Sequence, residues 1–463
     1  MEYQKVFALI NTSASMLILA GWLTSNAQGA SIEHQLSVSC VDDITAPIAR
    51  RWDDDDKPGA LRSGAGAPLV LTPVVWKVLA EPLVPVQGTD DRVHLAYELL
   101  FNNVTPDPVR MHSLHVVDPT QHGAAVGSYK VFAVDGNEIT GLFRRFTLRP
   151  NEVTNKVNDY SNVLAPGQAA VVYIDLTFEE AERIPRVIAH QVTISRGTLQ
   201  DAPISDEVEP PESVHAAEPP ITALGGCARV SKMQAVTVSP PLRGTRWLNA
   251  NGCCAVIGPH RFVIIAASGT LRPPEHFAID YLQLDALGTF YKDDPKLVGN
   301  WHGYGADILA VAPGIVVHVI DGLPDQIPLQ PPVGINADTA PGNSVIVDIG
   351  HGRFAAYAHM IPGSVRVKVG QAVHRGQGLG RIGNSGSSSA PHLHFQIMNR
   401  PSFLDAVGLP FVFDRMELQG RLVGATDDVL DQLFARLPVL TDFKDAGSRA
   451  QQMPLTLDLM EYR

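Results

Sequence analysis

The sequence predicts a mainly β protein, with an N-terminal immunoglobulin-like β-sandwich followed by a C-terminal antiparallel β domain. Three observations lead to this fold class. Short alternating segments such as residues 93–99 and 169–174 are separated by Pro, Gly, Asn and Asp, the strand spacing of a sandwich. The region 226–413 is rich in Val-containing segments and Gly turns. With 463 residues, 45% of them hydrophobic, the chain is long enough for two domains.

The first segment, residues 1–30, has the features of a signal peptide. Lys5 precedes an apolar run over residues 6–23, and small residues follow at Ser25, Ala27, Gly29 and Ala30. Polar residues at 11–15 interrupt the apolar run, which favours cleavage over a permanent span and leaves an uncleaved anchor as the alternative. We therefore expect an exported protein, periplasmic or extracellular, with no stable membrane span after cleavage.

The composition of the remaining chain predicts five further segments. Residues 31–67, with an acidic run at 53–56, form a disordered linker, and residues 68–200 form the sandwich. The sandwich has no catalytic cluster, so we expect a binding or spacer role, with a pure folding support as the alternative. Residues 201–225 are a Pro- and Glu-rich linker, and residues 226–415 form the second domain. The extension 416–463 contains one short helix, capped by Thr426 and carrying an apolar stripe at residues 430–437.

Charge and cysteine content limit the partners and the redox setting. A formal net charge of −12 and the lack of a basic patch argue against general nucleic-acid binding. Four cysteines, at positions 40, 227, 253 and 254, allow three pairings in an oxidising compartment. A bond between Cys227 and one of the adjacent pair would tie the linker to the second domain. We expect a vicinal Cys253–Cys254 bond to be the least favoured pairing because it is strained.

Histidines and a carboxylate at defined spacings predict a metal site in the second domain. His392 and His394 lie two residues apart in an alternating run, so both rings project from one face of a strand. His276 precedes Asp280 by four residues, and His359 lies in the segment YAHM. Imidazole and carboxylate groups are ligands of Zn²⁺. An H-x-H pair on a solvated face is the alternative for the first motif.

The stretch 343–397 resembles the core of the lysostaphin-type (LytM-like) zinc metallopeptidases, which cut peptides of the bacterial cell wall. The resemblance lies in YAHM at 357–360, VKVGQ at 367–371 with the glycines that follow it, the turn GNSGS at 383–387 and PHLHF at 391–395. It implies an antiparallel β peptidase domain of the barrel-sandwich or duplicated hybrid type. It also implies His276, Asp280 and His394 as Zn²⁺ ligands, His359 and His392 as the catalytic pair, and a peptidoglycan peptide as substrate.

These roles agree with zinc chemistry. Three protein ligands leave a fourth position for water, and zinc lowers the pKa of that water from about 15.7 towards roughly 7. The remaining pair of imidazoles orients the water, accepts its proton and hydrogen-bonds the tetrahedral intermediate, since their pKa near 6.5 suits acid–base work.

Several features depart from the resemblance or offer other assignments. Ala278 stands where the family usually has Gly, and a long insertion follows Asp280. Within it, His302 and Asp307 are a rival pair with a spacing of five. A Pro-rich loop at 323–342 is expected to rim the groove. His260 with Cys253 and Cys254 is an alternative, separate metal site.

Two functions from different classes remain. The first is an exported zinc endopeptidase that hydrolyses peptide bonds of peptidoglycan through a metal-activated water. The second is a catalytically inactive module of the same kind that binds the wall and regulates another hydrolase. A third and weaker alternative is a carbohydrate phosphotransfer domain that uses two histidines for phosphate relay. The predicted signal peptide argues against it, because the partners of such domains are cytoplasmic.

Overall fold

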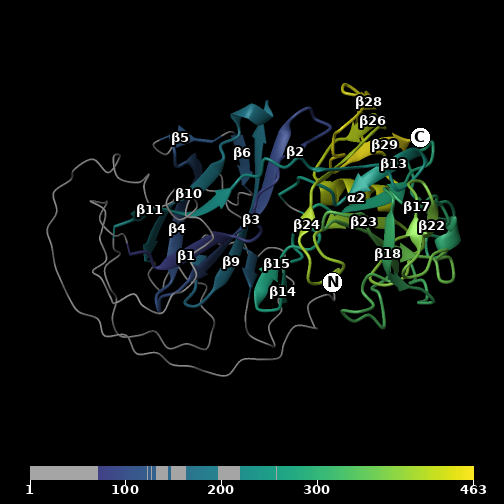
Figure 1. The fold of residues 1–463 in the computed structure, drawn as a ribbon, viewed down its shortest axis with the longest axis horizontal. Coiled ribbons are helices and arrows are strands. Elements are labelled where there is room, and N and C mark those ends of the chain that lie inside the picture. The colour runs from purple at the N-terminus through teal and green to yellow at the C-terminus, as the bar shows by residue number, and fades with distance from the viewer. Residues whose placement is uncertain are drawn as a thin grey trace.

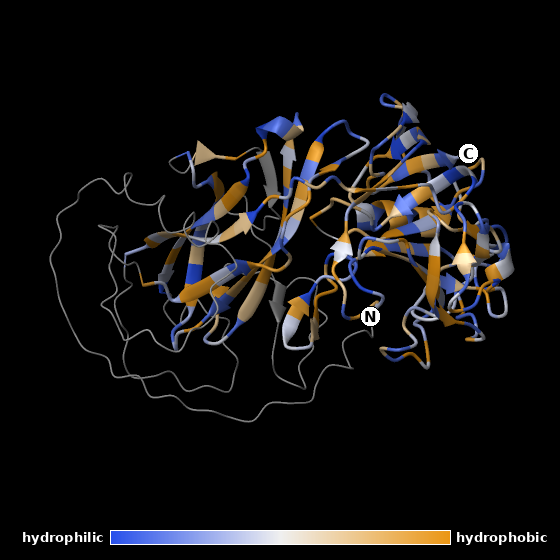
Figure 2. Ribbon diagram, in the orientation of Figure 1, coloured by the Kyte–Doolittle hydropathy of each residue, from blue (hydrophilic) through white to orange (hydrophobic). Residues whose placement is uncertain are grey.

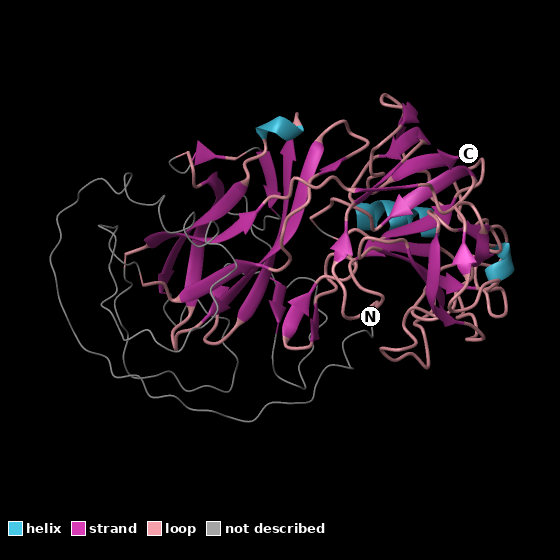
Figure 3. Ribbon diagram, in the orientation of Figure 1, coloured by secondary structure: helices cyan, strands magenta, loops and turns pink. Residues whose placement is uncertain are grey.

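The computed structural model describes residues 71–121, 124–126, 128–131, 144–146, 163–196, 219–256 and 258–463 (Figure 1). The expected signal peptide, the linker 31–67 and most of the linker 201–225 lie outside the described residues. Within the described residues, none of the helices has both the length and the apolar character needed to cross a membrane. The prediction of a mainly β protein is confirmed, since strands dominate both halves (Figure 3).

The N-terminal half consists of two antiparallel sheets. The first has the order β1-β3-β9-β6, with β2 on β3 and β7 on β9. The second has the order β11-β10-β4-β5, with β8 on β4. Their bounds are β1 Val74–Val78, β2 Val86–Gln87, β3 Val93–Asn103, β4 Val109–Asp118, β5 Ala124–Ala125, β6 Ser128–Val131, β7 Arg144–Phe146, β8 Val163–Leu164, β9 Ala169–Phe178, β10 Val187–Arg196 and β11 Ile221–Arg229, with the short 3₁₀ helix η2 at Ala181–Arg183.

One hydrophobic core lies between these two sheets, as in a β-sandwich. Leu95 and Ile174 from the first sheet pack with Leu114 and Val192 from the second. Alternation places every second residue of β3 in this core, and orange and blue bands alternate along many strands (Figure 2). We call the described residues within 74–229 the N-terminal sandwich; its immunoglobulin-like topology remains a prediction.

The C-terminal half is built on a twelve-stranded antiparallel sheet with the order β21-β18-β19-β20-β23-β16-β13-β29-β26-β27, plus β24 on β23 and β28 on β26. The bounds are β13 Gly244–Ala250, β16 Ile279–Gln283, β18 Gly314–Ile320, β19 Asn343–Asp348, β20 Phe354–Met360, β21 Ala372–Val373, β23 Leu393–Met398, β24 Gly408–Leu409, β26 Met416–Leu422, β27 Thr441–Asp442, β28 Gly447–Arg449 and β29 Asp458–Tyr462.

Smaller elements complete this half. They are the parallel pair β12 Val236–Val238 and β25 Phe411–Phe413, the hairpin β14 Ile265–Ala267 and β15 Thr270–Arg272, the pair β17 Asp307–Leu309 and β22 Gly378–Arg381, the 3₁₀ helix η4 Val298–Asn300 and the helix α2 Thr426–Phe434. The expected helix is thus present, but Ala425 is its N-cap and Thr426 its first residue. Val429 and Leu433 pack it against the sheet.

Two expected segment boundaries look different in the structure. Strand β11, Ile221–Arg229, spans the expected junction at residue 225 and pairs with β10 of the N-terminal sandwich. The expected C-terminal extension supplies β26 and β29, which continue the large sheet through β13. Both segments are therefore integral parts of the sheets that they join.

The two halves contact each other through buried polar groups. Strand β3 is buried along most of both faces, because Leu95 and Tyr97 enter the sandwich core while His94 and Glu98 face the C-terminal half. Glu98 bonds Arg261 from the C-terminal half. The two halves therefore share a polar interface rather than meeting only through a linker.

The adjacent cysteines form a disulfide with each other, so the prediction that a vicinal bond is the least favoured pairing is wrong. Both cysteines are buried and belong to the same hydrophobic cluster as Ala96 of β3. Cys227 is also disulfide-bonded, and Cys40 lies outside the described residues.

Candidate metal centre

Strand register brings the predicted carboxylate and one predicted imidazole together. Strand β16 pairs with β23 so that Asp280 lies directly opposite His394. Strand β20 pairs with the other edge of β23, and His359 lies at its end. His392 lies one residue before β23 begins at Leu393, and its ring, like that of His394, contacts Asp280. Four of the five residues predicted for the site therefore lie on, or directly before, three neighbouring strands.

A histidine that the sequence analysis assigned elsewhere completes the group. His260 Nε2 lies 3.2 Å from Asp280 Oδ2, and His394 Nδ1 lies 3.1 Å from Asp280 Oδ1. Ligand atoms of these three buried residues all lie within 4.8 Å of one another, close enough to bind one ion. His392 Nε2 lies 3.3 Å from Asp280 Oδ1, and the ring centroids of His359 and His392 are 4.7 Å apart.

Each imidazole has its outward nitrogen held by an acceptor. His260 Nδ1 lies 2.9 Å from the carbonyl oxygen of Asn251, and His359 Nδ1 lies 2.8 Å from that of Ser385. His392 Nδ1 contacts the carbonyl of Ala390 at 2.6 Å. His394 Nε2 lies 2.8 Å from Gln396 Oε1, whose own amide nitrogen donates to the carbonyl of Pro274. Such contacts place the N–H of each ring outward and its lone pair inward.

This arrangement fits a bound cation. When the N–H groups of His260 and His394 point at their outer acceptors, the inward lone pairs of both rings face the carboxylate oxygens of Asp280. Lone pairs facing a carboxylate repel unless a positive charge lies between them. Two imidazoles and one carboxylate are a typical donor set for catalytic zinc. Asn251 Nδ2 donates to Asp280 Oδ2 at 2.8 Å and further fixes the carboxylate.

Burial and neighbouring charges together raise the pKa of three histidines of the site and lower the pKa of the fourth. Burial by itself would raise the pKa of Asp280, but His260 and His392 hold it well below its usual range. Burial opposes protonation of the three histidines around it, yet Asp280 raises the pKa of each. Burial, reinforced by the charges of His392 and His394, instead holds the pKa of His359 well below its usual range. His359 is therefore the imidazole best kept neutral.

The structure places His276, the other predicted ligand, in a different contact. Its Nδ1 lies 2.7 Å from Glu98 Oε2 of the N-terminal sandwich, and its ring stacks on Phe277. His276 lies before β16 begins at Ile279, so it does not share the alternation that orients Asp280. In the described part of the chain, His276 belongs to no group of three potential ligands. Sequence reasoning missed His260 as a partner of Asp280 because no local spacing rule relates two residues twenty positions apart.

The other assignments considered from sequence do not join this group. Asp307 lies in β17 and pairs with Arg366 at 2.7 Å, while His302 faces Asp285 at 3.6 Å. Cys253 and Cys254 are joined to each other, so they are not thiolate partners of His260. The loop at 323–342 lies along the turn that holds His359, since Gln326 N–H donates to the carbonyl of Asn384.

Comparison with known proteins assigns this part of the chain to a family. Residues 302–406, which include His359, His392 and His394, match Peptidase family M23. This part of the chain is an M23 peptidase domain. His260 and Asp280 lie upstream of the matched residues, and strand pairing brings Asp280 to the domain.

Relatives of known structure or function match limited parts of the chain. Peptidoglycan DD-endopeptidase ShyA from Vibrio cholerae is 32% identical over 97 residues, which cover 20% of this chain and about a fifth (22%) of ShyA. The catalytic domain of EnpA from Enterococcus faecalis is 20% identical and covers 37% of this chain and 92% of its own, with a TM-score of 0.23. The catalytic domain of lysostaphin from Staphylococcus simulans is 24% identical, covering 31% and 80%, with a TM-score of 0.19. At such low TM-scores, the match over residues 302–406 carries the assignment.

Proposed function

We propose that this protein is an exported zinc-dependent endopeptidase that hydrolyses peptide bonds of peptidoglycan. The observation that carries the proposal is the group His260, Asp280 and His394, which has the donor set of a catalytic zinc and lies beside two further imidazoles. The M23 domain supports peptidase chemistry. The likeness to the peptidoglycan endopeptidase ShyA supports the substrate, and the apolar segment at residues 6–23 supports export.

In this proposal His260, Asp280 and His394 hold the zinc, and His359 and His392 do the acid–base work. Zinc supplies Lewis acidity, which polarises the scissile carbonyl and eases deprotonation of water. His359, kept neutral by burial, accepts the proton of the attacking water at Nε2 while Nδ1–H donates to Ser385. His392, whose pKa Asp280 raises, donates a proton or a hydrogen bond to the developing oxyanion or leaving amine.

Zinc analysis of four purified chains tests the ligand set. We expect about one zinc per wild-type chain and per His276→Ala chain, but loss of zinc in His260→Ala and His394→Ala. His260 and His276 are a matched pair, because both are buried histidines with a carboxylate partner. Loss of zinc in His276→Ala with retention in His260→Ala would restore the assignment made from sequence and refute the one proposed here.

Digestion of purified peptidoglycan, followed by chromatography of the fragments, tests the activity. His359→Ala and His392→Ala should retain zinc and lose turnover, by about 10²-fold or more for loss of a general acid or base. If the wild-type chain contains no zinc and binds peptidoglycan without cutting it, the catalytically inactive regulatory module replaces the enzyme as the function.

A further inference from the structure

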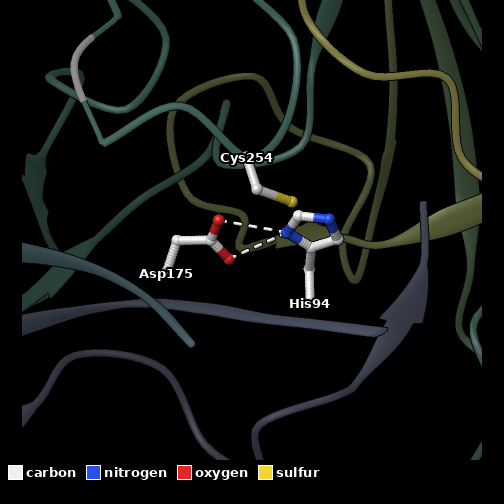
Figure 4. A group of neighbouring side chains, drawn as sticks. All are labelled: His94, Asp175 and Cys254. Atoms are coloured by element: carbon white, nitrogen blue, oxygen red, sulfur yellow. Dashed lines mark hydrogen bonds and ion pairs between the residues drawn. The ribbon is translucent and has the colours of Figure 1, made fainter. Parts of the chain in front are cut away.

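A second group of potential metal ligands lies at the interface between the two halves of the protein. It consists of His94 from β3, Asp175 from β9 and Cys254 from the loop before β14, all buried, with ligand atoms within 4.8 Å of one another (Figure 4). Asp175 pairs across the strands with Ala96, so it lies diagonal to His94 on the face that the C-terminal half covers. Ala96 and Cys254 pack in one core cluster.

The histidine of this group is held in the orientation of a metal ligand. Asp90 contacts His94 Nε2 at 3.1 and 3.2 Å, while both oxygens of Asp175 contact Nδ1 at 3.1 and 3.0 Å. Metal-binding histidines typically donate their second N–H to a carboxylate, as Nε2 does here to Asp90. Burial would lower the pKa of His94, but the two carboxylates raise it to about 9. The two carboxylates therefore stabilise positive charge at this position, carried by the protonated His94 ring or by an ion that displaces its Nδ1 proton.

The third donor, the Cys254 sulfur, is oxidised in the structure and therefore cannot bind a metal as a thiolate. Cys254 is joined to Cys253 in a disulfide, and its Sγ points to the edge of the His94 ring next to Nδ1 (Figure 4). Reduction gives a Cys254 thiol that already lies beside His94 and Asp175, so no rearrangement of the chain is needed. Thiolate, imidazole and carboxylate together are zinc ligands, with thiolate favouring soft divalent ions.

We propose that reduction of the Cys253–Cys254 disulfide creates a second metal site, in which His94 Nδ1, a carboxylate oxygen of Asp175 and the Cys254 thiolate bind Zn²⁺ or a similar divalent ion. A dithiol transfers two electrons and two protons to the disulfide and is itself oxidised to a disulfide. Binding of the ion then releases the Cys254 and His94 protons to solvent. The bound ion joins the N-terminal sandwich to the C-terminal half, so the interface becomes stronger in reducing conditions.

Cobalt spectroscopy of the full-length protein tests this site separately from the proposed zinc centre. Co²⁺ bound to a thiolate gives an intense sulfur-to-metal charge-transfer band in the near ultraviolet. The group His260, Asp280 and His394 contains no sulfur. We expect no such band when Co²⁺ is added to the oxidised protein, and a saturable band at one further ion per chain after reduction with a phosphine. If the group His260, Asp280 and His394 binds no metal, reduction raises the number of Co²⁺ ions bound per chain from zero to one. If that group binds metal, reduction raises the number from one to two.

Two matched variants decide which thiol binds. Cys253→Ser and Cys254→Ser both abolish the disulfide and share any effect of its loss, but only Cys253→Ser retains the proposed ligand. Cys253→Ser should give the band without any reductant, and Cys254→Ser should give none in either state. His94→Gln should weaken Co²⁺ binding at least 10-fold, while Cys227→Ser should leave the band after reduction unchanged. Absence of the band in both reduced wild type and Cys253→Ser, or its persistence in Cys254→Ser, would overturn the proposal.

Discussion

Replacing Glu98 by Gln should show that the N-terminal sandwich fixes the geometry of the proposed metal centre. Glu98 lies on β3 with 1% of its surface exposed. Its Oε1 accepts a hydrogen bond from Arg261 Nε at 2.9 Å, and its Oε2 contacts His276 Nδ1 at 2.7 Å. Arg261 directly follows His260, and His276 precedes Asp280 by four residues. One carboxylate of the sandwich therefore holds both chain segments that carry the proposed metal ligands His260 and Asp280.

The expected loss of stability follows from the charges left behind. Burial would raise the pKa of Glu98, but His276 and Arg261 hold it below its usual range, so the carboxylate is ionised. Gln has the same shape without the charge, and Arg261, with 2% of its surface exposed, then lacks a counter-charge. Breaking a buried ion pair in this way costs about 3–5 kcal/mol. Because Arg261 Nη2 still donates to the carbonyls of Tyr97 and Ile174, we expect the lower value, about 3 kcal/mol.

Urea denaturation measures the free energy of unfolding, and competition with a chelator measures the affinity for zinc. Glu98→Gln should lower the free energy of unfolding by about 3 kcal/mol. It should lower the zinc affinity by about 10- to 100-fold, the usual effect of disturbing groups that orient metal ligands. The double variant Glu98→Leu with Arg261→Met removes both charges and should recover most of the stability. If Glu98→Gln lowers the free energy of unfolding by less than about 1 kcal/mol and leaves the zinc affinity unchanged, the sandwich does not stabilise the proposed metal centre.

Three further predictions concern single residues. Gln396→Leu removes the acceptor of His394 Nε2 and should weaken zinc binding about 10- to 100-fold in the same competition assay; an unchanged affinity would contradict the role given to Gln396. Gly386 has φ +75° and an added Cβ would lie 2.3 Å from Gly342 N, so Gly386→Ala should shift the carbonyl of Ser385 that holds His359 and reduce peptidoglycan turnover while zinc content stays the same; full activity would count against it. Burial lowers the pKa of His190 from 6.5 to about 4, so the unfolded chain takes up a proton at higher pH than the folded chain, and stability should fall by about 3 kcal/mol as pH drops from 6.5 through 4; His190→Gln should show a flatter urea-denaturation profile over that range, and an equal slope in both proteins would rule the cause out.

The common direction of His392 and His394 could be predicted, because side chains two residues apart in an extended segment point the same way. The same rule explains why Gln396 lies on that face and reaches His394. The match of residues 302–406 to an M23 domain agrees with the resemblance read from YAHM, GNSGS and PHLHF. Local backbone geometry and residue type were sufficient for these conclusions.

The choice between His260 and His276 depended on contacts that no local spacing contains. The four-residue interval from His276 to Asp280 suggested a shared site, but β16 begins only at Ile279. Glu98, which contacts His276, lies 178 positions earlier in the chain. His260 reaches Asp280 because its ring is held by the carbonyls of Asn251 and Ala278. The proximity of the Cys254 sulfur to His94 is likewise a consequence of how the two halves pack.

By itself, the sequence determined the mainly β class, the face shared by the H-x-H pair and the type of chemistry that its residues can perform. Only the tertiary structure decided which histidine meets Asp280 and that β3 turns His94 and Glu98 towards the C-terminal half. The physical reason is that alternation along a strand is set by bonds between neighbouring residues. Contacts between distant segments depend instead on how whole sheets and loops bury their surfaces against one another.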